Sequence, residues 1–308
     1  MSHLVNTAAP VDPPSQSQVL IQVPPLFKFA RVAAYTGGIG AFATADIPLG
    51  TCVLCEVPII IASTSTLSSR VAALSDSSRR QLFSLHDNWV SQPGGDKTAV
   101  GIFRSNGYPT DESQEEGGVF LKFSRFNSSC TPNVSHRWSS TAGVRFVFAT
   151  RLIKSGEELL NCYISPIGSR SARQSALQSH FGFKCSCRCC SLSGVAQSES
   201  DARRLECCTL DEQIFNLIRT GKYRQSVEQV ERLLEVLKNE GLDSPACLAR
   251  SAFDAFQACK HGEDKEGMKK WIKFYLEQQL LCDVETSEDL REMTRIAESL
   301  GVILEHPR

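Results

Sequence analysis

Apolar residues follow two different periods along this chain. At 27 to about 61, 119–123, 144–149 and 157–163, short runs rich in β-branched and aromatic side chains are bounded by Gly and Pro, which predicts short strands. Beyond residue 203, apolar residues recur about every three or four positions, which predicts amphipathic helices. These helices are expected at 210–218, 227–237, 246–259, 271–282 and 290–300. The chain therefore divides into a β-rich first part and a helical second part.

The remaining segments complete the predicted domain plan. Helical spacing at 66–90 predicts one or two short helices, and the Gly- and acid-rich stretch 91–118 is expected to include an exposed loop. Residues 1–25, rich in Pro, Ser and Gln, are expected to form a disordered tail. We therefore expect a β-rich domain at 27–163 with a helical insertion at about 63–118. A helical C-terminal domain at 205–304 would follow, with helix pairs that resemble tetratricopeptide arrays.

Composition narrows the function. Of 308 residues, 42% are hydrophobic, and 33 Lys and Arg against 34 Asp and Glu give a net charge of −1. This balance argues against nucleic acid as a direct ligand, because phosphate binding normally needs a basic excess. The apolar runs fall short of the ~20 residues that span a bilayer, and residues 1–25 lack the pattern of a signal peptide. We therefore expect no membrane association and a cytoplasmic and/or nuclear location.

The 13 cysteines indicate a metal site, because a reduced compartment does not favour a disulfide framework. Cys185, Cys187 and Cys190 have Cys-x-Cys-x-x-Cys spacing, and thiolates so close in sequence need a soft divalent ion such as Zn²⁺. Cys189 could replace Cys190, and a fourth ligand is required. Four further cysteines are expected to pack, in a strand or in the helical part: Cys52, Cys55, Cys207 and Cys208.

Four segments in this order resemble the SET-domain protein lysine methyltransferases. They are the Gly38-Ile39-Gly40 turn, RFNSSCTPN at 125–133, GEELLNCY at 156–163 and FGFKCSCRCC at 181–190. The resemblance covers about residues 27–193 and is closest to the SET-and-MYND class and its fungal relatives. It implies an α+β fold of small sheets with a threaded C-terminal segment, and a post-SET zinc segment at 164–193. Because no cysteine occurs between Cys55 and Cys130, the MYND finger of that class is absent from the interval.

The resemblance also implies roles for individual residues. The cofactor S-adenosylmethionine would be bound by Gly38, Ile39, Gly40, Asn106, Asn127, Ser128, Tyr163 and Phe183. Tyr163 would be catalytic, Phe181 would line the substrate channel, and Cys130 would be the fourth zinc ligand. Read locally, each residue has an ordinary alternative: glycines and asparagines form turns, and aromatic residues pack. Ser128 stands where the family has His, which puts the contacts of that side chain in question but leaves its backbone groups available.

We therefore expect an S-adenosylmethionine-dependent protein-lysine N-methyltransferase acting on a protein that presents a lysine, histone or not. The helical domain would recruit protein partners. The alternative is a SET fold that has lost catalysis and serves as a binding module. Ser128 and the missing MYND finger favour that alternative, whereas Asn127, Tyr163 and the cysteine set favour the enzyme.

Overall fold

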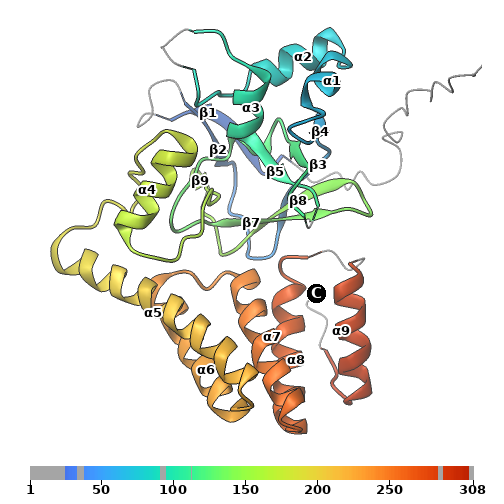
Figure 1. Ribbon diagram of the computed structural model, residues 1–308, viewed down its shortest axis with the longest axis vertical. Coiled ribbons are helices and arrows are strands. Elements are labelled where there is room, and N and C mark those ends of the chain that lie inside the picture. Colours follow the sequence, from blue (N-terminus) through green and yellow to red (C-terminus); the bar gives the residue numbers. More distant parts are fainter. Residues whose placement is uncertain (1–24, 33–37, 91–94, 112, 284–286, 305–308) are drawn as a thin grey trace, which may run out of the picture.

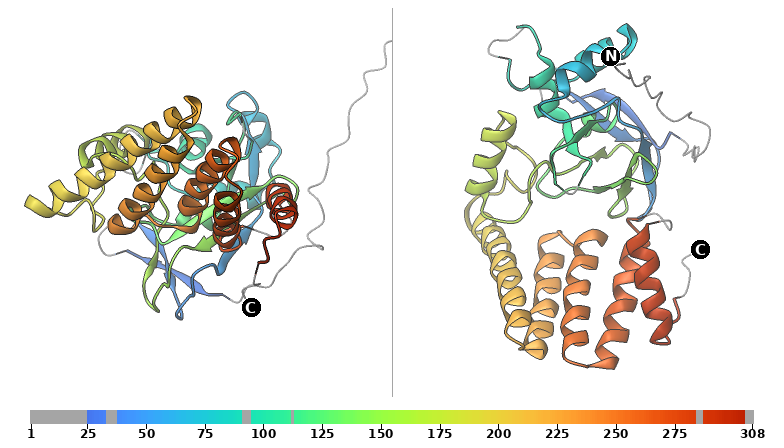
Figure 2. Two further views of the ribbon diagram at one scale, coloured as in Figure 1. Left: turned by 90° about the horizontal axis from the view of Figure 1, so that it is seen from below. Right: turned by 45° about the vertical axis from the view of Figure 1, so that its right-hand side comes forward.

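The computed structural model describes residues 25–32, 38–90, 95–111, 113–283 and 287–304, so the predicted tail at 1–25 lies almost wholly outside the described residues. The described chain has a β-rich half and a helical half, one above the other in Figure 1. This arrangement confirms the α+β class. Two further views show the long C-terminal helices standing side by side against the β-rich half (Figure 2).

Nine short strands form three antiparallel sheets of three strands each within the described residues. The sheet β1–β2–β9 comprises Phe27–Arg31, Ile39–Ala43 and Glu158–Leu159. The sheet β3–β8–β7 comprises Cys52–Glu56, Val144–Ala149 and Val134–Ser139. The sheet β4–β6–β5 comprises Ile60–Ala62, Gly117–Val119 and Gly107–Pro109. All six residues of the central strand β8 are buried, which explains why five of them are apolar; the exception is the buried Arg145.

Helices surround the sheets and then form the second half. The first four are α1 (Leu67–Ala72), α2 (Asp76–Phe83), α3 (Ala99–Asn106) and α4 (Arg170–Phe181), with a 3₁₀ turn at Phe123–Arg125. The second half consists of α5 (Gly194–Arg219), α6 (Tyr223–Glu240), α7 (Pro245–His261), α8 (Lys265–Gln279) and α9 (Glu288–Ser299). These helices share one apolar core, in which Cys207 is fully buried, as expected of a packing cysteine. No helix in the described ranges is long and apolar enough to cross a membrane.

Several sequence-based boundaries were wrong. Within 91–118, the structure has helix α3, strand β5 and the start of β6, and strand β5 was not predicted. The strand expected at 119–123 lies at Gly117–Val119 and gives way to the 3₁₀ turn, and only Glu158–Leu159 of 157–163 is a strand. Strand β7 and helix α4 were not predicted, and α5 begins near residue 194. The bounds of these short elements depend on packing against segments that are distant in sequence, and a local sequence pattern does not contain that information.

The second and third motif segments run alongside each other. Asn161 N donates to Asn127 O at 2.9 Å, and Ser129 N donates to Asn161 O at 2.8 Å, around a parallel bridge between Ser128 and Asn161. The buried Asn133 side chain donates to Glu158 O at 2.8 Å and accepts from Leu160 N at 2.7 Å. Residues more than 20 positions apart are thereby held as one unit, which places Asn127 and Tyr163 in the same region.

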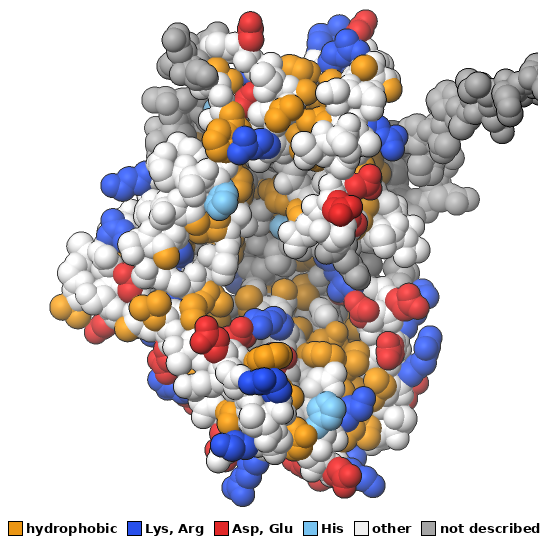
Figure 3. Space-filling view, in the orientation of Figure 1, with side chains coloured by type: hydrophobic (Ala, Val, Ile, Leu, Met, Phe, Trp, Pro, Cys, Tyr) orange, Lys and Arg blue, Asp and Glu red, His pale blue; other side chains and the backbone are white. Residues whose placement is uncertain are grey.

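The β-rich half and the helical half meet at an interface that is held by ion pairs and contains a cavity. Arg137 of β7 forms an ion pair with the buried Asp283 at 2.6 Å and a longer one with Asp289 of α9 at 3.2 Å. Next to these pairs, a cavity of about 670 Å³ lies between β7 and helices α7–α9, with Phe253, Phe256 and Met293 in its lining. On the face seen in Figure 3, hydrophobic side chains gather over the helical half among acidic and basic ones. The ion pairs therefore hold the halves together beside an apolar hollow.

His136 makes folding stability depend on pH. Its Nδ1 contacts Arg145 Nη1 at 2.6 Å, and burial, with the nearby guanidinium, lowers the pKa of His136 to about 3. The folded state thus keeps His136 neutral, whereas the unfolded chain takes up a proton below its ordinary pKa of about 6.5. Above about pH 6.5, His136 does not reduce the free energy of unfolding. As the pH falls from about 6.5 toward 3, this free energy decreases, and the decrease at pH 5 is at most about 2 kcal/mol.

We therefore expect urea unfolding of the native protein to lose more stability between pH 7.5 and 5.0 than His136→Gln loses. The exposed His180 supplies the control, because His180→Gln should keep the native pH dependence. Equal losses for the native protein and His136→Gln would contradict this assignment.

Candidate functional site

A cavity of about 670 Å³ lies in the β-rich half at the point where five stretches of chain converge. Its lining comes from the start of β2, the loop after α2, the last turn of α3, segment 124–128, and the aromatic residues that flank α4. Seven of the eight residues expected to bind a cofactor line it: Gly38, Ile39, Asn106, Asn127, Ser128, Tyr163 and Phe183. Gly40 and Phe181 lie directly behind this lining, against Asn127 and Tyr163 respectively.

The side chain of Asn127 is oriented by two acceptors. Its Nδ2 donates to Glu158 Oε1 at 2.7 Å and to Ile39 O at 3.3 Å. Both amide hydrogens are thereby used, so Oδ1 is the atom that Asn127 can present to a ligand. Burial raises the pKa of Glu158, while the bond from Asn127 acts in the opposite direction. Glu158 had no assigned role in the sequence, although it lies within the third motif segment.

Position 40 leaves no room for a side chain, because the backbone of β2 passes close to Glu158 and Asn127. A Cβ at Gly40 would clash with Glu158 Oε1 and would lie 3.1 Å from Asn127 Nδ2. Gly40→Ala should therefore displace the Glu158 carboxylate and release the Asn127 amide. We expect cofactor affinity, measured by calorimetry, to fall about tenfold, close to the cost of losing one charge-assisted hydrogen bond.

Glu158→Ala is the matched comparison, because it removes the same bond without adding an atom and should weaken binding similarly. Zinc content should stay unchanged in both variants. Native affinity in Gly40→Ala would show that Asn127 needs no support from Glu158.

Tyr163 is held by both its backbone and its hydroxyl group. Its N–H donates to Ser128 Oγ at 3.2 Å, and its hydroxyl group donates to Phe126 O at 2.8 Å. The ring lies 5.1 Å from the Phe181 ring and 6.4 Å from the Phe183 ring, edge-on to the latter. The serine that departs from the family pattern thus supplies a hydrogen bond that fixes the tyrosine backbone.

Asn106 holds the far wall of the cavity. Its Nδ2 donates to His86 O at 2.7 Å and to Ile102 O at 2.8 Å, which ties the loop after α2 to helix α3. Lys97 donates to Leu85 O at 2.6 Å in the same loop. Neither Lys97 nor the loop was singled out from the sequence, because no motif marks them and only the tertiary structure brings them to the cavity.

The charged groups in the cavity lining are positive. Lys97 and Arg125 both line it, and Arg125 Nη2 donates to Ser84 Oγ at 3.0 Å. No carboxylate from the described ranges is part of the lining. A carboxylate-bearing ligand is therefore favoured here, and a bound amine would be more easily deprotonated.

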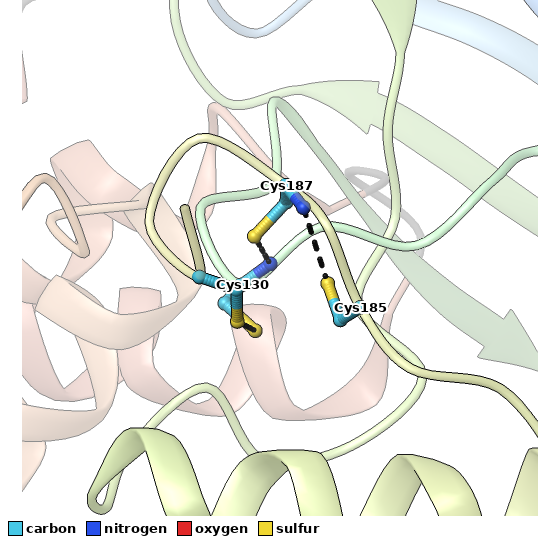
Figure 4. A group of neighbouring side chains, drawn as sticks. Cys130, Cys185 and Cys187 are labelled. Carbon is cyan, nitrogen blue, oxygen red and sulfur yellow. Dashed lines mark hydrogen bonds between the residues drawn. The ribbon is translucent and has the colours of Figure 1, made fainter. Parts of the chain in front are cut away.

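The four cysteines expected to bind zinc come together beside the cavity. The sulfurs of Cys130, Cys185, Cys187 and Cys190 all lie within 4.8 Å of one another, and the Cys130 and Cys190 sulfurs are 3.5 Å apart. Figure 4 shows the Cys187 sulfur directed at the Cys130 backbone N, and the Cys187 backbone N directed at the Cys185 sulfur. Four sulfurs around a tetrahedral Zn²⁺ lie about 3.8 Å apart, so the group fits that ion.

Cys189 lies outside this group. Its sulfur accepts a hydrogen bond from Arg173 Nη2 at 3.3 Å and lies 3.8 Å from Ser200 Oγ. Of the two adjacent cysteines left open by the sequence, Cys190 is therefore the one that joins the cluster. Gly182 ends helix α4 with a left-handed φ of 70°. The chain thereby turns toward Phe183 and the first cysteine of the cluster, Cys185.

Without a cation, the thiol protons are shared unevenly in the cluster, because hydrogen bonds from Cys130, Cys185 and Cys190 lower the pKa of Cys187. Hydrogen bonds to the sulfurs of Cys185, Cys187 and Cys190 raise the pKa of the Cys130 thiol far above its ordinary value, and burial adds to this. A divalent ion would displace these protons, so metal binding should release protons and weaken in acid. The donor set, with two backbone N–H groups directed at sulfur, is suited to a structural zinc ion.

Cys52 and Cys55 pack as expected of strand residues. Both lie in β3 against the aromatic side chains of β8, Phe146 and Phe148. Burial raises the pKa of both thiols, to about 11 for Cys52, which keeps them protonated. Neither belongs to a metal-binding group among the described residues.

Comparison with known proteins identifies the family. Residues 38–164 match the SET domain family. Histone-lysine N-methyltransferase set5 of Schizosaccharomyces pombe is 33% identical over 231 residues, covering 73% of this chain and 70% of that protein. Protein-lysine N-methyltransferase SMYD4 of Homo sapiens is 34% identical over 94 residues, covering 30% of this chain and 11% of that protein. A putative SET domain-containing protein of Acanthamoeba polyphaga mimivirus is 28% identical over 189 residues, covering 50% and 73%.

These similarities confirm the resemblance read from the motif segments. The match to the SET domain begins at the glycine turn and extends just beyond Tyr163, so it includes every described residue of the cavity lining except Phe183. The cysteine cluster that could hold zinc lies next to it. This chain belongs to the SET-domain family of protein-lysine N-methyltransferases, which transfer a methyl group from S-adenosylmethionine to a lysine amine.

Proposed function

We propose that the cavity beside the cysteine cluster is the methyl-transfer site and that the chain methylates a lysine of a histone. The observation that supports the site is the convergence on one cavity of six predicted residues from the motif segments, together with Asn106. The histone assignment rests on the relative from Schizosaccharomyces pombe, which is named as a histone-lysine methyltransferase. A histone substrate would place the activity in the nucleus.

The cofactor would be bound by a small number of groups. Asn127 Oδ1 would accept from the ammonium of the methionine part, because its Nδ2 is bound to Glu158 and Ile39. Arg125 and Lys97 would attract its carboxylate. Phe183 would stack on the adenine, and Asn106 would act through the loop that it holds.

Methyl transfer needs a neutral amine that is correctly oriented. When bound, S-adenosylmethionine supplies an electrophilic methyl group on a positively charged sulfur. An ordinary lysine has a pKa of about 10.4, and the positive cavity with its partly buried walls would lower that pKa and favour the neutral amine. Tyr163, fixed by Ser128 and Phe126, would direct its hydroxyl oxygen toward the reacting groups, while Phe181 would line the lysine channel.

The metal would be structural. We propose that Cys130, Cys185, Cys187 and Cys190 hold one Zn²⁺, which attaches the segment after α4 to the motif segment at 127–133. Phe183 lies two residues before Cys185, so this attachment would also position the adenine-stacking ring. No step of the reaction uses the ion.

Cofactor binding should depend on Phe183. Phe183→Ala removes an aromatic face that would stack on adenine, which is worth up to about 1.5 kcal/mol beyond area burial, so we expect about tenfold weaker binding or more. Calorimetry with S-adenosylhomocysteine measures this without turnover. Phe215→Ala serves as control, because Phe215 is 67% exposed on helix α5 in the other half of the protein.

Asn127→Ala should weaken binding similarly. If the dissociation constant is unchanged in both variants, the proposed cofactor site is wrong.

The substrate is tested directly. Incubation of the full chain with radiolabelled S-adenosylmethionine and core histones should label a histone, whereas the same histones with chemically blocked lysines should stay unlabelled. Cofactor binding with no label on histones, but label on other lysate proteins, would refute the histone assignment and keep the enzyme.

A further inference from the structure

Two of the largest fully buried side chains in the described chain are arginines next to the cysteine cluster. Arg173 of α4 is 2% exposed and Arg204 of α5 is 0% exposed. A guanidinium stays charged under all ordinary conditions, so burying one is costly unless anions and acceptors surround it. Neither residue lines the methyl-transfer cavity, so catalysis does not account for them.

Arg173 contacts the sulfur of Cys189, which adjoins the cluster. Its Nη2 donates to Cys189 Sγ at 3.3 Å, and Nη1 donates to Gly168 O. Its Nε has no partner among the described residues. The carboxylate of Asp201, at 3.7 Å, is too far for a hydrogen bond. Arg173 therefore donates to the sulfur of Cys189, next in sequence to the proposed ligand Cys190, and has no carboxylate within hydrogen-bond distance among the described residues.

Arg204 connects the cluster to the helical half. Its Nη1 donates to Cys130 O at 3.1 Å and to Pro166 O, and its Nε donates to Glu240 Oε1 of α6 at 2.7 Å. Glu240 is shared, since Arg203 Nε also donates to it at 2.8 Å. Arg204 Nη2 has no partner in the described part of the chain.

The region therefore carries excess positive charge. One carboxylate serves both Arg203 and Arg204, and Arg173 has only the distant Asp201. Four thiolates around one Zn²⁺ carry a net double negative charge, which would balance this excess at short range.

We propose that Arg173 and Arg204 are positioning residues of the metal centre, which balance the charge of a zinc tetrathiolate and couple its occupancy to the docking of helices α5 and α6. The inference rests on the proposed zinc site. Arg173 acts through Cys189, the neighbour of the ligand Cys190, and Arg204 acts through the Cys130 carbonyl group. Loss of the metal would leave two buried cations undercompensated and would loosen the contact between the halves.

Zinc affinity of the full chain, measured by chelator competition, tests the assignment. We expect Arg173→Met and Arg204→Met to bind Zn²⁺ about 10- to 100-fold more weakly, the usual effect of removing a group that supports a metal ligand. Arg203→Met is the matched control, because Arg203 binds the other oxygen of the same Glu240 carboxylate. The Arg203 side chain is 34% exposed and makes no hydrogen bond to Cys130 in the described structure. Its zinc affinity should match that of the native protein.

Thermal unfolding with and without zinc supplies a second readout. Zinc should raise the Tm of the native protein and of Arg203→Met by the same amount, and should raise that of Arg204→Met by less. If Arg204 only pairs with Glu240, its replacement lowers both Tm values equally, and the inference is wrong. Should Arg204→Met fail to fold, Arg173→Met is measured in the same way, because it leaves the Glu240 ion pairs intact.

The outcomes separate this inference from the zinc site itself. If the native protein binds neither Zn²⁺ nor Co²⁺, the zinc site is wrong. If the native protein binds one Zn²⁺ and the Arg173 and Arg204 variants bind it equally tightly, only the positioning role is overturned. Arg173→Lys, which keeps the positive charge, should recover part of the lost affinity.

Discussion

Replacing Tyr163 with Phe is expected to lower kcat by about 100-fold or more, equivalent to about 2.7 kcal/mol of transition-state stabilisation. The physical reason is orientation, because the variant removes the oxygen that would direct the lysine amine and keeps the ring between Phe181 and Phe183. Steady-state kinetics on a verified substrate, with calorimetry for cofactor affinity, separate chemistry from binding. Affinity should change little.

The variant also loses the hydrogen bond from Tyr163 to Phe126 O, so stability should fall by about 1 kcal/mol. Tyr275→Phe controls for this effect, because it removes a hydroxyl group that accepts from Gln279 Nε2 in the helical half, away from the cavity. If Tyr163→Phe turns over as fast as Tyr275→Phe, Tyr163 is a packing residue.

Replacing Cys187 with Ser is expected to reduce the zinc content from about one ion per chain to near zero. Structural zinc binding is folding free energy, so the segment after Phe181 should become disordered and its backbone amides should exchange rapidly. Elemental analysis and hydrogen exchange over residues 183–193 measure the two effects. Cofactor affinity should fall as well, since Phe183 belongs to the same segment.

Cys189→Ser is the matched control for the zinc prediction. Cys189 is next to Cys190 in sequence but its sulfur faces Arg173 and Ser200, so the variant should keep its zinc. Equal zinc loss in both variants would mean that Cys189 is a ligand, and native protein without zinc would remove the site.

Strands and helices were predicted correctly from the sequence where their local pattern of apolar residues is strong, and were missed where it is weak. Strand β8 was predicted with its observed bounds because five of its six residues are apolar, a strong local signal that matches its complete burial. Strand β7, with the sequence VSHRWS, was missed because its residues are mostly half-buried and polar, and only pairing with β8 makes it a strand. Helix α4 was missed because only two of its residues, Arg173 and Leu177, are fully buried, too few to show a periodic apolar face.

The site residues also fall into those that the sequence motifs identified and those that only the structure identified. The residues in contiguous motifs, among them Asn127, Tyr163 and Phe183, were found from the sequence and lie together at the cavity. Lys97 and Arg125 were missed as site residues, because their positions depend on where α3 and the 3₁₀ turn pack. Glu158 stood inside a motif, yet only its hydrogen bond to Asn127 shows its part.

By itself, the sequence determined the family, the order of the β-rich and helical parts, and the cysteine spacing, because these are local or periodic features that survive without a folded chain. The tertiary structure alone decided between Cys189 and Cys190, which share one local sequence but direct their sulfurs to different neighbours. It also decided the surroundings of Arg204, whose partners Cys130 and Glu240 are 74 and 36 positions away. Side-chain direction and long-range contact are set by packing, so no local pattern contains them.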